Sequence, residues 1–237
     1  MSDTGEVSAV ELWTVDVDAL SDAADGELTG WLSADEQARA AAFARPRDRR
    51  RSRRRRAAVR WVLSSYLDVD PAAVSFEVGD HGRPEVAGKA LSFGVAHSGG
   101  ASVVAVSRCR AGVGVDIELD RPIDSLEQMM TVACTDREMA SIRSLPPTAR
   151  SRRFLSVWTA KEAVLKAVGL GLSVDPRQVE VELTPSGGVC VTWVASPLAD
   201  WFVAMPVNPR RGDLVSALAV AGRGPVRVDW MPSLRLP

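Results

Sequence analysis

Residues 154–173 read FLSVWTAKEAVLKAVGLGLS, and the spacing of apolar residues in this stretch predicts a long helix. At about 100° per residue, the apolar side chains return to one face. Gly169 and Gly171 suit a helix C-cap and a tight exit from the helix. We therefore expect a helix that packs on a core and ends at Gly169. Its apolar face consists of Phe154, Val157, Trp158, Val164, Leu165 and Val168.

Three charged residues of this helix have two interpretations. Lys161 projects from the middle of the apolar face, and Glu162 and Lys166 lie along its edge. A buried lysine needs an anionic partner, so the three could belong to a site. Alternatively, Lys161 extends its ammonium group into water, and Glu162 and Lys166 form an ordinary i,i+4 surface pair. The helix taken alone favours this second interpretation.

Composition narrows the class of protein. The chain has 237 residues, 46% hydrophobic and 25% charged, which is typical of one large globular domain or two small ones. Cys109, Cys134 and Cys190 have neither disulfide-framework nor zinc-site spacing, so we expect reduced thiols. Signal-peptide features and runs of about 18 apolar residues are absent from the sequence, so we expect a cytoplasmic protein with no membrane partner.

Arginines crowd residues 45–60, although the net charge of the chain is only −1. A helix is expected over residues 48–67, and it places Arg51 and its neighbours in the first turns. Cations are disfavoured there because the helix dipole is positive at that end. A bound phosphate would reverse this effect. A solvated basic face and a nucleic-acid-binding surface are the two alternative interpretations.

Residues 112–119, GVGVDIEL, predict a strand with two different faces. Val113, Val115 and their apolar partners share one face, and Gly114, Asp116 and Glu118 share the other. Carboxylates two residues apart can converge on one cation, and Mg²⁺ typically takes one or two carboxylates with phosphates and waters. We expect Gly114 to leave room for such a phosphate. The alternative is a half-exposed strand with a polar outer face.

The other elements follow from turn signals and periodicity. Asp120-Arg121-Pro122 predicts a turn between the two halves of the chain, and no element is expected after residue 222. The pattern is compatible with two similar α/β lobes, residues 1–111 and 112–237. Further strands are expected at 10–17, 74–78, 91–96, 102–106, 179–183, 189–194, 201–205 and 214–221, and further helices at 33–44 and 125–142.

Four motifs occur in order along the chain. They are Gly82-Arg83-Pro84, FGVAHSG at residues 93–99, GVDIE at 114–118, and W-x-x-K-E-x-x-x-K at 158–166 followed by Gly169-x-Gly171-Leu172. This series resembles the 4′-phosphopantetheinyl transferases, in particular their larger, monomeric Sfp-like group. The spaced pair of the last two motifs is the specific part. The detailed resemblance covers residues 33–173.

The resemblance implies an α/β (α+β) fold of two similar lobes in a pseudo-twofold arrangement, with the active site in the cleft between them. It implies an enzyme that transfers the phosphopantetheine arm of coenzyme A to a serine of an acyl or peptidyl carrier protein and releases 3′,5′-ADP. Such carriers serve polyketide, nonribosomal peptide or fatty acid synthesis. Mg²⁺, for which Mn²⁺ could substitute, is the implied cofactor, and coenzyme A is the substrate.

Residue roles carry over motif by motif. Asp116, Glu118 and Glu162 would hold the metal, and Glu162 and Lys166 would act in catalysis. One departure is clear, because the family's F-N-x-S-H-S turn has Gly94 in place of asparagine and Ala96 in place of the first serine. The residues expected to contact coenzyme A are Arg47, Arg51, Arg83, Pro84, His97, Ser98 and Lys161.

Partners and competing functions complete the expectations. A nucleic-acid-binding protein and a metal-dependent phosphohydrolase are distant alternatives, so we expect no nucleic acid partner. The carrier protein is expected to dock on residues 125–142, around Met129, Met130 and Arg137, because methionines suit adaptable surfaces and arginines suit an acidic partner. The alternative is that these methionines fill the core.

Overall fold

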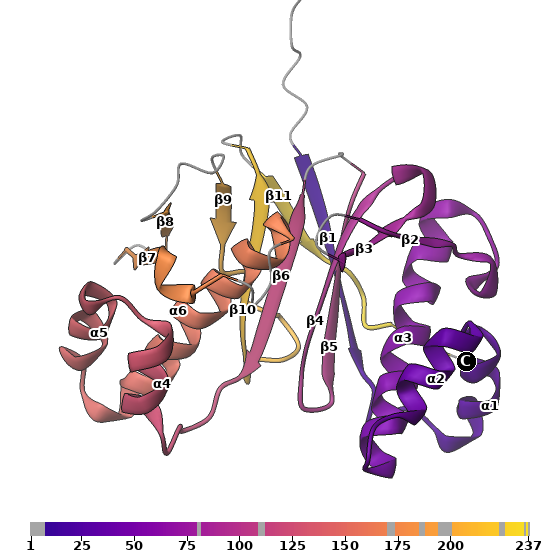
Figure 1. Cartoon of the computed structure of the whole chain (residues 1–237), viewed down its shortest axis with the longest axis horizontal. Coiled ribbons are helices and arrows are strands. Elements are labelled where there is room, and N and C mark those ends of the chain that lie inside the picture. The colour runs from indigo at the N-terminus through magenta and orange to yellow at the C-terminus, as the bar shows by residue number, and fades with distance from the viewer. Residues whose placement is uncertain are drawn as a thin grey trace, which may run out of the picture.

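Two β-sheets pack face to face, and one long helix covers the outer face of each sheet (Figure 1). This computed structural model describes residues 8–79, 82–108, 112–169, 174–184, 188–193, 201–222, 226–234 and 236. Gly171 and Leu172 of the last motif, and Cys109, lie outside the described residues. Within the described part of the chain, no helix is both long and apolar enough to span a bilayer.

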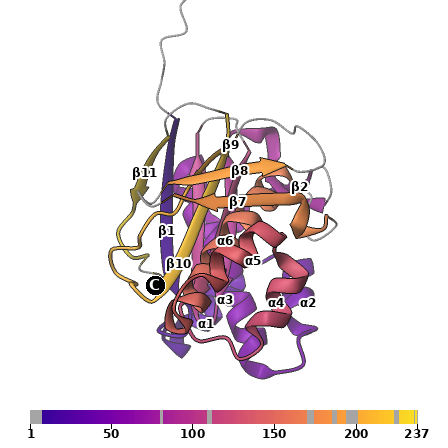
Figure 2. The same cartoon turned by 90° about the vertical axis from the view of Figure 1, so that its left-hand side faces the viewer.

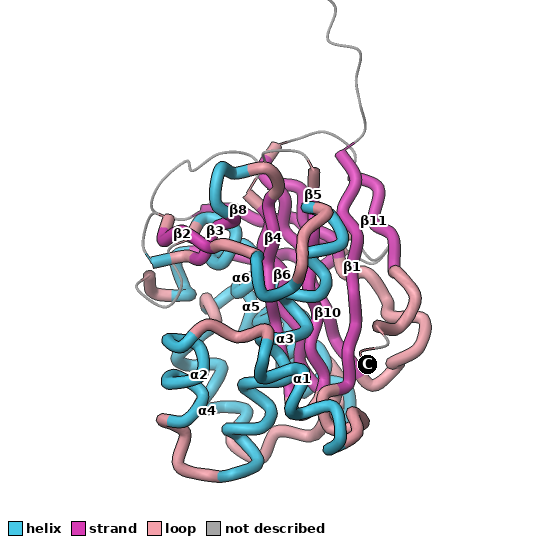
Figure 3. Tube along the Cα trace, turned by 90° about the vertical axis from the view of Figure 1, so that its right-hand side faces the viewer, coloured by secondary structure: helices cyan, strands magenta, loops and turns pink. Residues whose placement is uncertain are grey.

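The first lobe contains a sheet of four strands, β1 (Ser8–Asp16), β4 (Ser92–Ser98), β5 (Ala101–Ser107) and β11 (Val226–Trp230), in the order β11-β1-β5-β4. Its helices are α1 (Asp25–Gly30), α2 (Ala34–Ala41) and α3 (Pro46–Leu67), and β2 (Phe76–Val78) pairs with β3 (Pro84–Val86). Figure 3 shows α1 and α2 beside α3. Single 3₁₀ turns lie in this lobe at Asp22–Ala24, Pro71–Ala73 and Ala87–Lys89, and in the second lobe at Pro176–Gln178.

The second lobe contains a sheet of β6 (Val113–Leu119), β10 (Leu214–Ala221) and β9 (Trp201–Ala204), in the order β6-β10-β9. Helix α6 (Pro147–Val168) covers this sheet, and α4 (Leu126–Ala133) and α5 (Asp136–Arg143) pack beside α6. The antiparallel pair β7 (Val179–Leu183) and β8 (Val189–Trp193) lies over α6 (Figure 2).

Strand β6 has the two faces that its sequence predicts. Val113, Val115 and Ile117 are buried between the two sheets. Gly114 faces α6, and a Cβ atom there would lie 2.0 Å from the carbonyl oxygen of Ala163. The expectation that Gly114 makes room for a phosphate is therefore wrong. Its lack of a side chain instead lets the backbone of α6 approach β6, which brings polar groups of both elements together.

The helix ends follow from local chemistry. Ser33 and Glu36 form the expected capping box of α2. Helix α6 begins at Pro147, earlier than expected, because proline is well tolerated at the first helical position. Gly169 caps its other end with φ of 87°, a left-handed conformation that favours glycine, as the sequence predicts.

Two arginines of the run on α3, Arg54 and Arg60, are buried. Arg54 is 2% exposed, and its guanidinium group bonds Asp22 and Asp25. Arg60 is also buried and pairs with Glu36, which accepts from Arg56 as well. The interpretation of the run as a solvated basic face is wrong for these residues. They attach α3 to α1 and α2 through buried ion pairs.

Candidate functional site

Buried carboxylates meet an ammonium group where α6 crosses β6. Lys166 Nζ lies 2.5 Å from Asp116 Oδ1, and Asp116 is only 6% exposed. Glu162, one helical turn before Lys166, is 8% exposed. Asp116 Oδ2 and Glu162 Oε1 are both buried without a hydrogen-bond partner among the described residues. Because buried polar atoms are nearly always paired, these two oxygens mark a place where a ligand belongs.

The electrostatics of this cluster agree with that inference. Desolvation raises the pKa of Asp116 to about 6, although the ammonium of Lys166 lowers it, and the charges of Glu118 and Glu162 add to the rise. The pKa of Glu162 is also raised, first by desolvation and then by Glu118, against the effect of Lys166. One lysine thus does not compensate the negative charge that three neighbouring carboxylates carry when ionised.

The carboxylates fit a hard cation such as Mg²⁺. Mg²⁺ is usually bound by one or two protein carboxylates. Asp116 on β6 and Glu162 on α6 each offer one oxygen that has no partner among the described residues. In the described part of the chain, no three Asp, Glu, His or Cys side chains converge into a ready-made metal cluster. Glu118 Oε2 accepts a hydrogen bond of 2.7 Å from the Ser98 hydroxyl.

The turn after β4 connects the first lobe to this centre. The Ser98 hydroxyl donates to Glu118 and accepts from the backbone N–H of Leu119, at 3.1 Å. Its only proton is therefore used, and Ser98 orients Glu118 across the two lobes. His97 is exposed beside it. Desolvation by the surrounding protein, followed by the positive charges of Arg55 and Lys166, lowers the pKa of His97.

Two adjoining pockets of about 270 Å³ each lie between the lobes, and both are lined by Arg83, Pro84, Phe93 and Gly169. Lys166, which pairs with Asp116, lines one of them. The structure thus brings residues of the Gly82-Arg83-Pro84 motif, of β4 and of the end of α6 together around these pockets.

Arg83 also has a structural function in this cleft. Its guanidinium nitrogens donate to the carbonyls of Lys166 and Ala167, at 3.1 and 2.8 Å, and to those of Phe93 and Val113, at 2.8 and 2.7 Å. A cation at a helix C-terminus is stabilised by the helix dipole. Arg83 therefore joins the end of α6 to β4 and β6.

Lys161 lies away from the cluster. Its ammonium is fully buried and contacts Glu138 Oε2 at 2.6 Å and the carbonyls of Ala133 and Pro176 at 2.8 and 3.1 Å. Lys161 therefore does have an anionic partner, as its position on the apolar face indicates. The ammonium is buried and its contacts with Glu138, Ala133 and Pro176 are all internal. The expected contact of Lys161 with coenzyme A is therefore wrong. The alternative, in which the ammonium extends into water, is wrong as well.

The arginines expected near the phosphates lie at the start of α3. Arg51 pairs with Asp18 and is the main cause of the lowered pKa of that carboxyl. Arg47 is exposed, and its positive charge lowers the same pKa to a smaller extent. Sequence analysis did not single out Arg55, whose Nη2 donates to the carbonyl of Gly99 at 2.6 Å. The signal was its position one helical turn after Arg51, on the same side of α3.

Comparison with known proteins identifies the family of this chain. The chain is 33% identical to the 4′-phosphopantetheinyl transferase HetI of Nostoc sp. over 227 residues, which cover 94% of this chain and 90% of that protein. The chain belongs to the 4′-phosphopantetheinyl transferase superfamily. The model of this superfamily matches residues 112–214, which include Asp116, Glu162 and Lys166. A phosphopantetheinyl transferase of Thraustochytrium sp. is 32% identical over 201 residues, covering 78% of this chain and 69% of that protein.

Among solved structures, a holo-(acyl-carrier-protein) synthase from Bacillus anthracis, in complex with coenzyme A, matches 46% of this chain and 94% of its own. Its TM-score is 0.40 and its sequence identity 23%. The mixed α/β fold and membership of a superfamily of transferases make this chain an enzyme of the transferase class.

Proposed function

We propose that this chain transfers the 4′-phosphopantetheine arm of coenzyme A to a serine of an acyl or peptidyl carrier protein and releases 3′,5′-ADP. The observation that carries the proposal is the pair of buried carboxylate oxygens without partners among the described residues, on Asp116 and Glu162. Lys166 pairs with Asp116 and lines a pocket together with Arg83 and Pro84. A diphosphate needs both a cationic donor and a metal, and this place offers the ligands for both.

Asp116 and Glu162 would hold Mg²⁺, with Glu118 as the third carboxylate. When bound, Mg²⁺ supplies charge neutralisation for the diphosphate and for the leaving 3′,5′-ADP. Lys166 is one third exposed and would donate to the phosphoryl group under attack. The pocket would take the adenine and thereby orient the diphosphate toward Lys166.

The reaction breaks one phosphorus–oxygen bond and forms another. The carrier serine oxygen attacks the phosphorus that bears the pantetheine arm, and the oxygen of 3′,5′-ADP leaves. The serine proton needs an acceptor, and Glu162 is our candidate because it lies one helical turn before Lys166 and its Oε1 has no partner among the described residues; ligation of Mg²⁺ by the same carboxylate weakens it as a base.

The finer expectations rest on the same arrangement. We assign the chain to the larger, monomeric Sfp-like group, because both sides of the cleft come from one chain. The proposed lobes remain residues 1–111 and 112–237, although β11 returns to pair with β1 in the first sheet. A cytoplasmic location is consistent with the free thiols of Cys134 and Cys190.

A carrier surface is proposed on α4 and α5. Met129 and Val132 are 40% and 70% exposed on α4, and an apolar surface of this kind suits a protein partner. Met130 is fully buried against α6, so it belongs to the core and not to the surface. Arg137 is exposed but already pairs with Glu180 and Glu182.

The deciding experiment incubates the protein with coenzyme A, Mg²⁺ and several apo carrier proteins and then measures the mass of each carrier. We expect one phosphopantetheine adduct per carrier. Carriers with the acceptor serine replaced by alanine are the control and should gain no mass. An unchanged mass for every carrier, with intact coenzyme A, would contradict the proposal. Hydrolysis of coenzyme A without transfer would favour a phosphohydrolase.

A further inference from the structure

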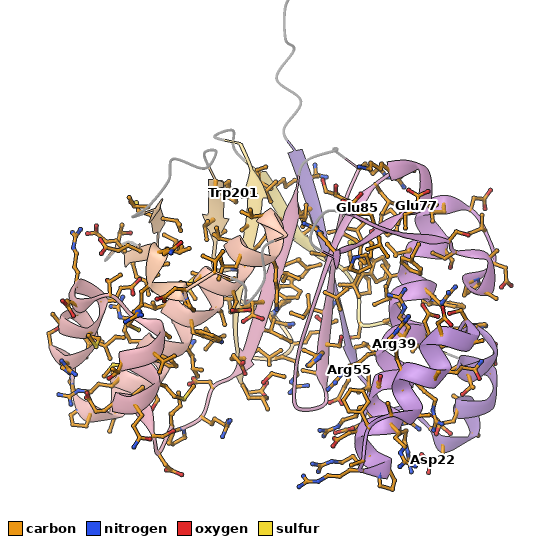
Figure 4. The ribbon with its side chains drawn as sticks, in the orientation of Figure 1. Asp22, Arg39, Arg55, Glu77, Glu85 and Trp201 are labelled. Atoms are coloured by element: carbon orange, nitrogen blue, oxygen red, sulfur yellow. The ribbon has the colours of Figure 1, made fainter. Side chains whose placement is uncertain are left out.

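Another cavity, the α6–β10 cavity, lies in the second lobe alone. Its volume is about 470 Å³, and small-molecule sites typically have about 300–1,000 Å³. The first half of α6, the end of β7, the connection from β9 to β10 and the start of β10 line it. It shares no described lining residue with the pockets that Arg83 and Pro84 line. The arginines of the first lobe, among them Arg39 and Arg55, lie on the other side of the two sheets (Figure 4), so the cavity is distinct from the cleft between the lobes.

The wall of the α6–β10 cavity is mostly apolar. Its apolar side chains include Leu145, Leu183, Met205, Pro206, Val207 and Val215. Val207 is 77% exposed, so the apolar wall extends to the surface. The Ser156 hydroxyl donates to the carbonyl of Arg152 at 3.0 Å. The Ser216 hydroxyl donates to the carbonyl of Pro206. These two hydroxyl groups are used inside the protein, so recognition of a polar group falls to the charged side chains of the wall.

Arg153 supplies a cationic group to this wall. It is half-buried and has no hydrogen bond or ion pair in the described part of the chain. Its neighbour Arg152 already has an ion pair with a carboxylate. Arg153 also lines a smaller cavity together with Glu180 and Glu182. Both of these carboxylates pair with Arg137. A guanidinium group that has lost part of its hydration without gaining a partner favours a bound anion.

We propose that the α6–β10 cavity binds a small aliphatic monocarboxylate, with the carboxylate at Arg153 and the chain on the apolar wall. A guanidinium group holds a carboxylate through two parallel, charge-assisted hydrogen bonds. The chain gains free energy by leaving water, and Met205 has an unbranched side chain that can adapt to it. One unpaired guanidinium group balances one negative charge, so a carboxylate fits better than a phosphate monoester, which carries nearly two. This site goes beyond the proposed transfer reaction, because none of these residues belongs to the carboxylate cluster.

The test is calorimetric titration of the whole chain with octanoate and with 1-octanol, a neutral molecule of the same chain length. We expect one octanoate to bind per chain, in the presence of saturating coenzyme A as well as in its absence. Arg153→Gln should weaken octanoate binding about tenfold or more, because a charge-assisted contact is lost, and should change 1-octanol binding by no more than about twofold. Arg177→Gln is the matched control. It removes the same charge from an exposed pair with Asp175 outside the cavity, so its octanoate affinity should equal that of the wild type.

Three results would overturn the inference. They are a wild type without saturable octanoate binding, wild-type octanoate affinity of Arg153→Gln, and loss of octanoate binding when coenzyme A is present. Should Arg153→Gln unfold, Gly212→Leu provides a second test. Gly212 lines the cavity, and a Cβ atom there has nothing within 4 Å, so the larger side chain takes part of the cavity without a clash. This variant must weaken octanoate binding, and an unchanged affinity would equally overturn the inference.

Discussion

Lys161 and Glu138 form an ion pair of 2.6 Å with side chains that are 0% and 1% exposed, directly beside the proposed metal ligand Glu162 in the sequence. Glu138 also accepts from the backbone N–H groups of Thr135 and Val181, each at 2.7 Å. The pair therefore joins α5, α6 and β7, and all of its hydrogen bonds are internal. Lys161 and Glu162, although adjacent, serve different parts of the molecule.

Replacing Lys161 by methionine should destabilise the fold. The change leaves the Glu138 carboxylate buried and without a cation, which typically costs about 3–5 kcal/mol. Urea unfolding measures the change in free energy. Arg143→Met is the control, because Arg143 and Glu127 form an exposed pair that contributes little to stability. Folded Lys161→Met with wild-type stability but weak coenzyme A binding would restore the expected nucleotide contact.

Gly114→Ala should destabilise the protein by about 1–3 kcal/mol or more, since its Cβ atom would lie 2.0 Å from the backbone oxygen of Ala163 and force α6 away from β6. Metal affinity should fall as well, because Asp116 and Glu162 lie on the two separated elements. Gly26→Ala is the control. It has nothing within 4 Å and lies in α1, so it should be neutral or stabilising. Equal melting temperatures for the two variants would contradict this explanation.

Asp116→Asn should stabilise the metal-free protein while removing activity. Desolvation is the main reason that the pKa of Asp116 is raised from 3.8 to about 6 in the folded protein. The contribution of Asp116 to stability is therefore most favourable below about pH 4 and is lost as the pH rises through 6. The neutral amide avoids this loss, which amounts to about 3 kcal/mol for a shift of about 2 pH units at 1.36 kcal/mol per unit. The shift already includes the favourable contact with Lys166. Unfolding with chelator at pH 4 and pH 8 measures the difference.

The gain in Asp116→Asn must grow between pH 4 and pH 8. A constant gain would show that pairing with Lys166 balances desolvation, and a loss at pH 8 would show that pairing outweighs it. Asp213→Asn is a control of opposite sign, because Arg211 holds the pKa of Asp213 below its usual value. That variant should lose a little stability at pH 8 and none at low pH.

Sequence patterns predicted the parts of the site that depend on one element. Alternation along β6 placed Asp116 on the face that meets α6, and the spacing of α6 placed Glu162 and Lys166 together. Contacts between distant segments were not predictable, since no local pattern shows that Lys161 meets Glu138 or that Arg55 reaches Gly99. Strand β11 was also missed. Its own sequence does not indicate a strand, and it is extended because it pairs with β1, which is far away in the sequence.

Glu162→Gln should lower kcat much more than it raises KM for coenzyme A. The amide keeps the shape of the side chain but is a poor base and a weaker metal ligand, so the transition state loses more than the bound nucleotide does. Steady-state kinetics at saturating Mg²⁺ measure both constants. Equal effects on kcat and on KM would leave Glu162 with a binding function alone.

Two neighbouring methionines on α4 provide a test of the carrier surface. Met129 is 40% exposed and Met130 is fully buried, so the same change has different consequences at each. Met129→Glu should keep the melting temperature and the KM for coenzyme A while raising the KM for the carrier, since carriers are generally acidic. Met130→Glu should lose about 4 kcal/mol or more of stability, because it buries a charge in the core. A wild-type carrier KM for Met129→Glu would place the docking surface elsewhere.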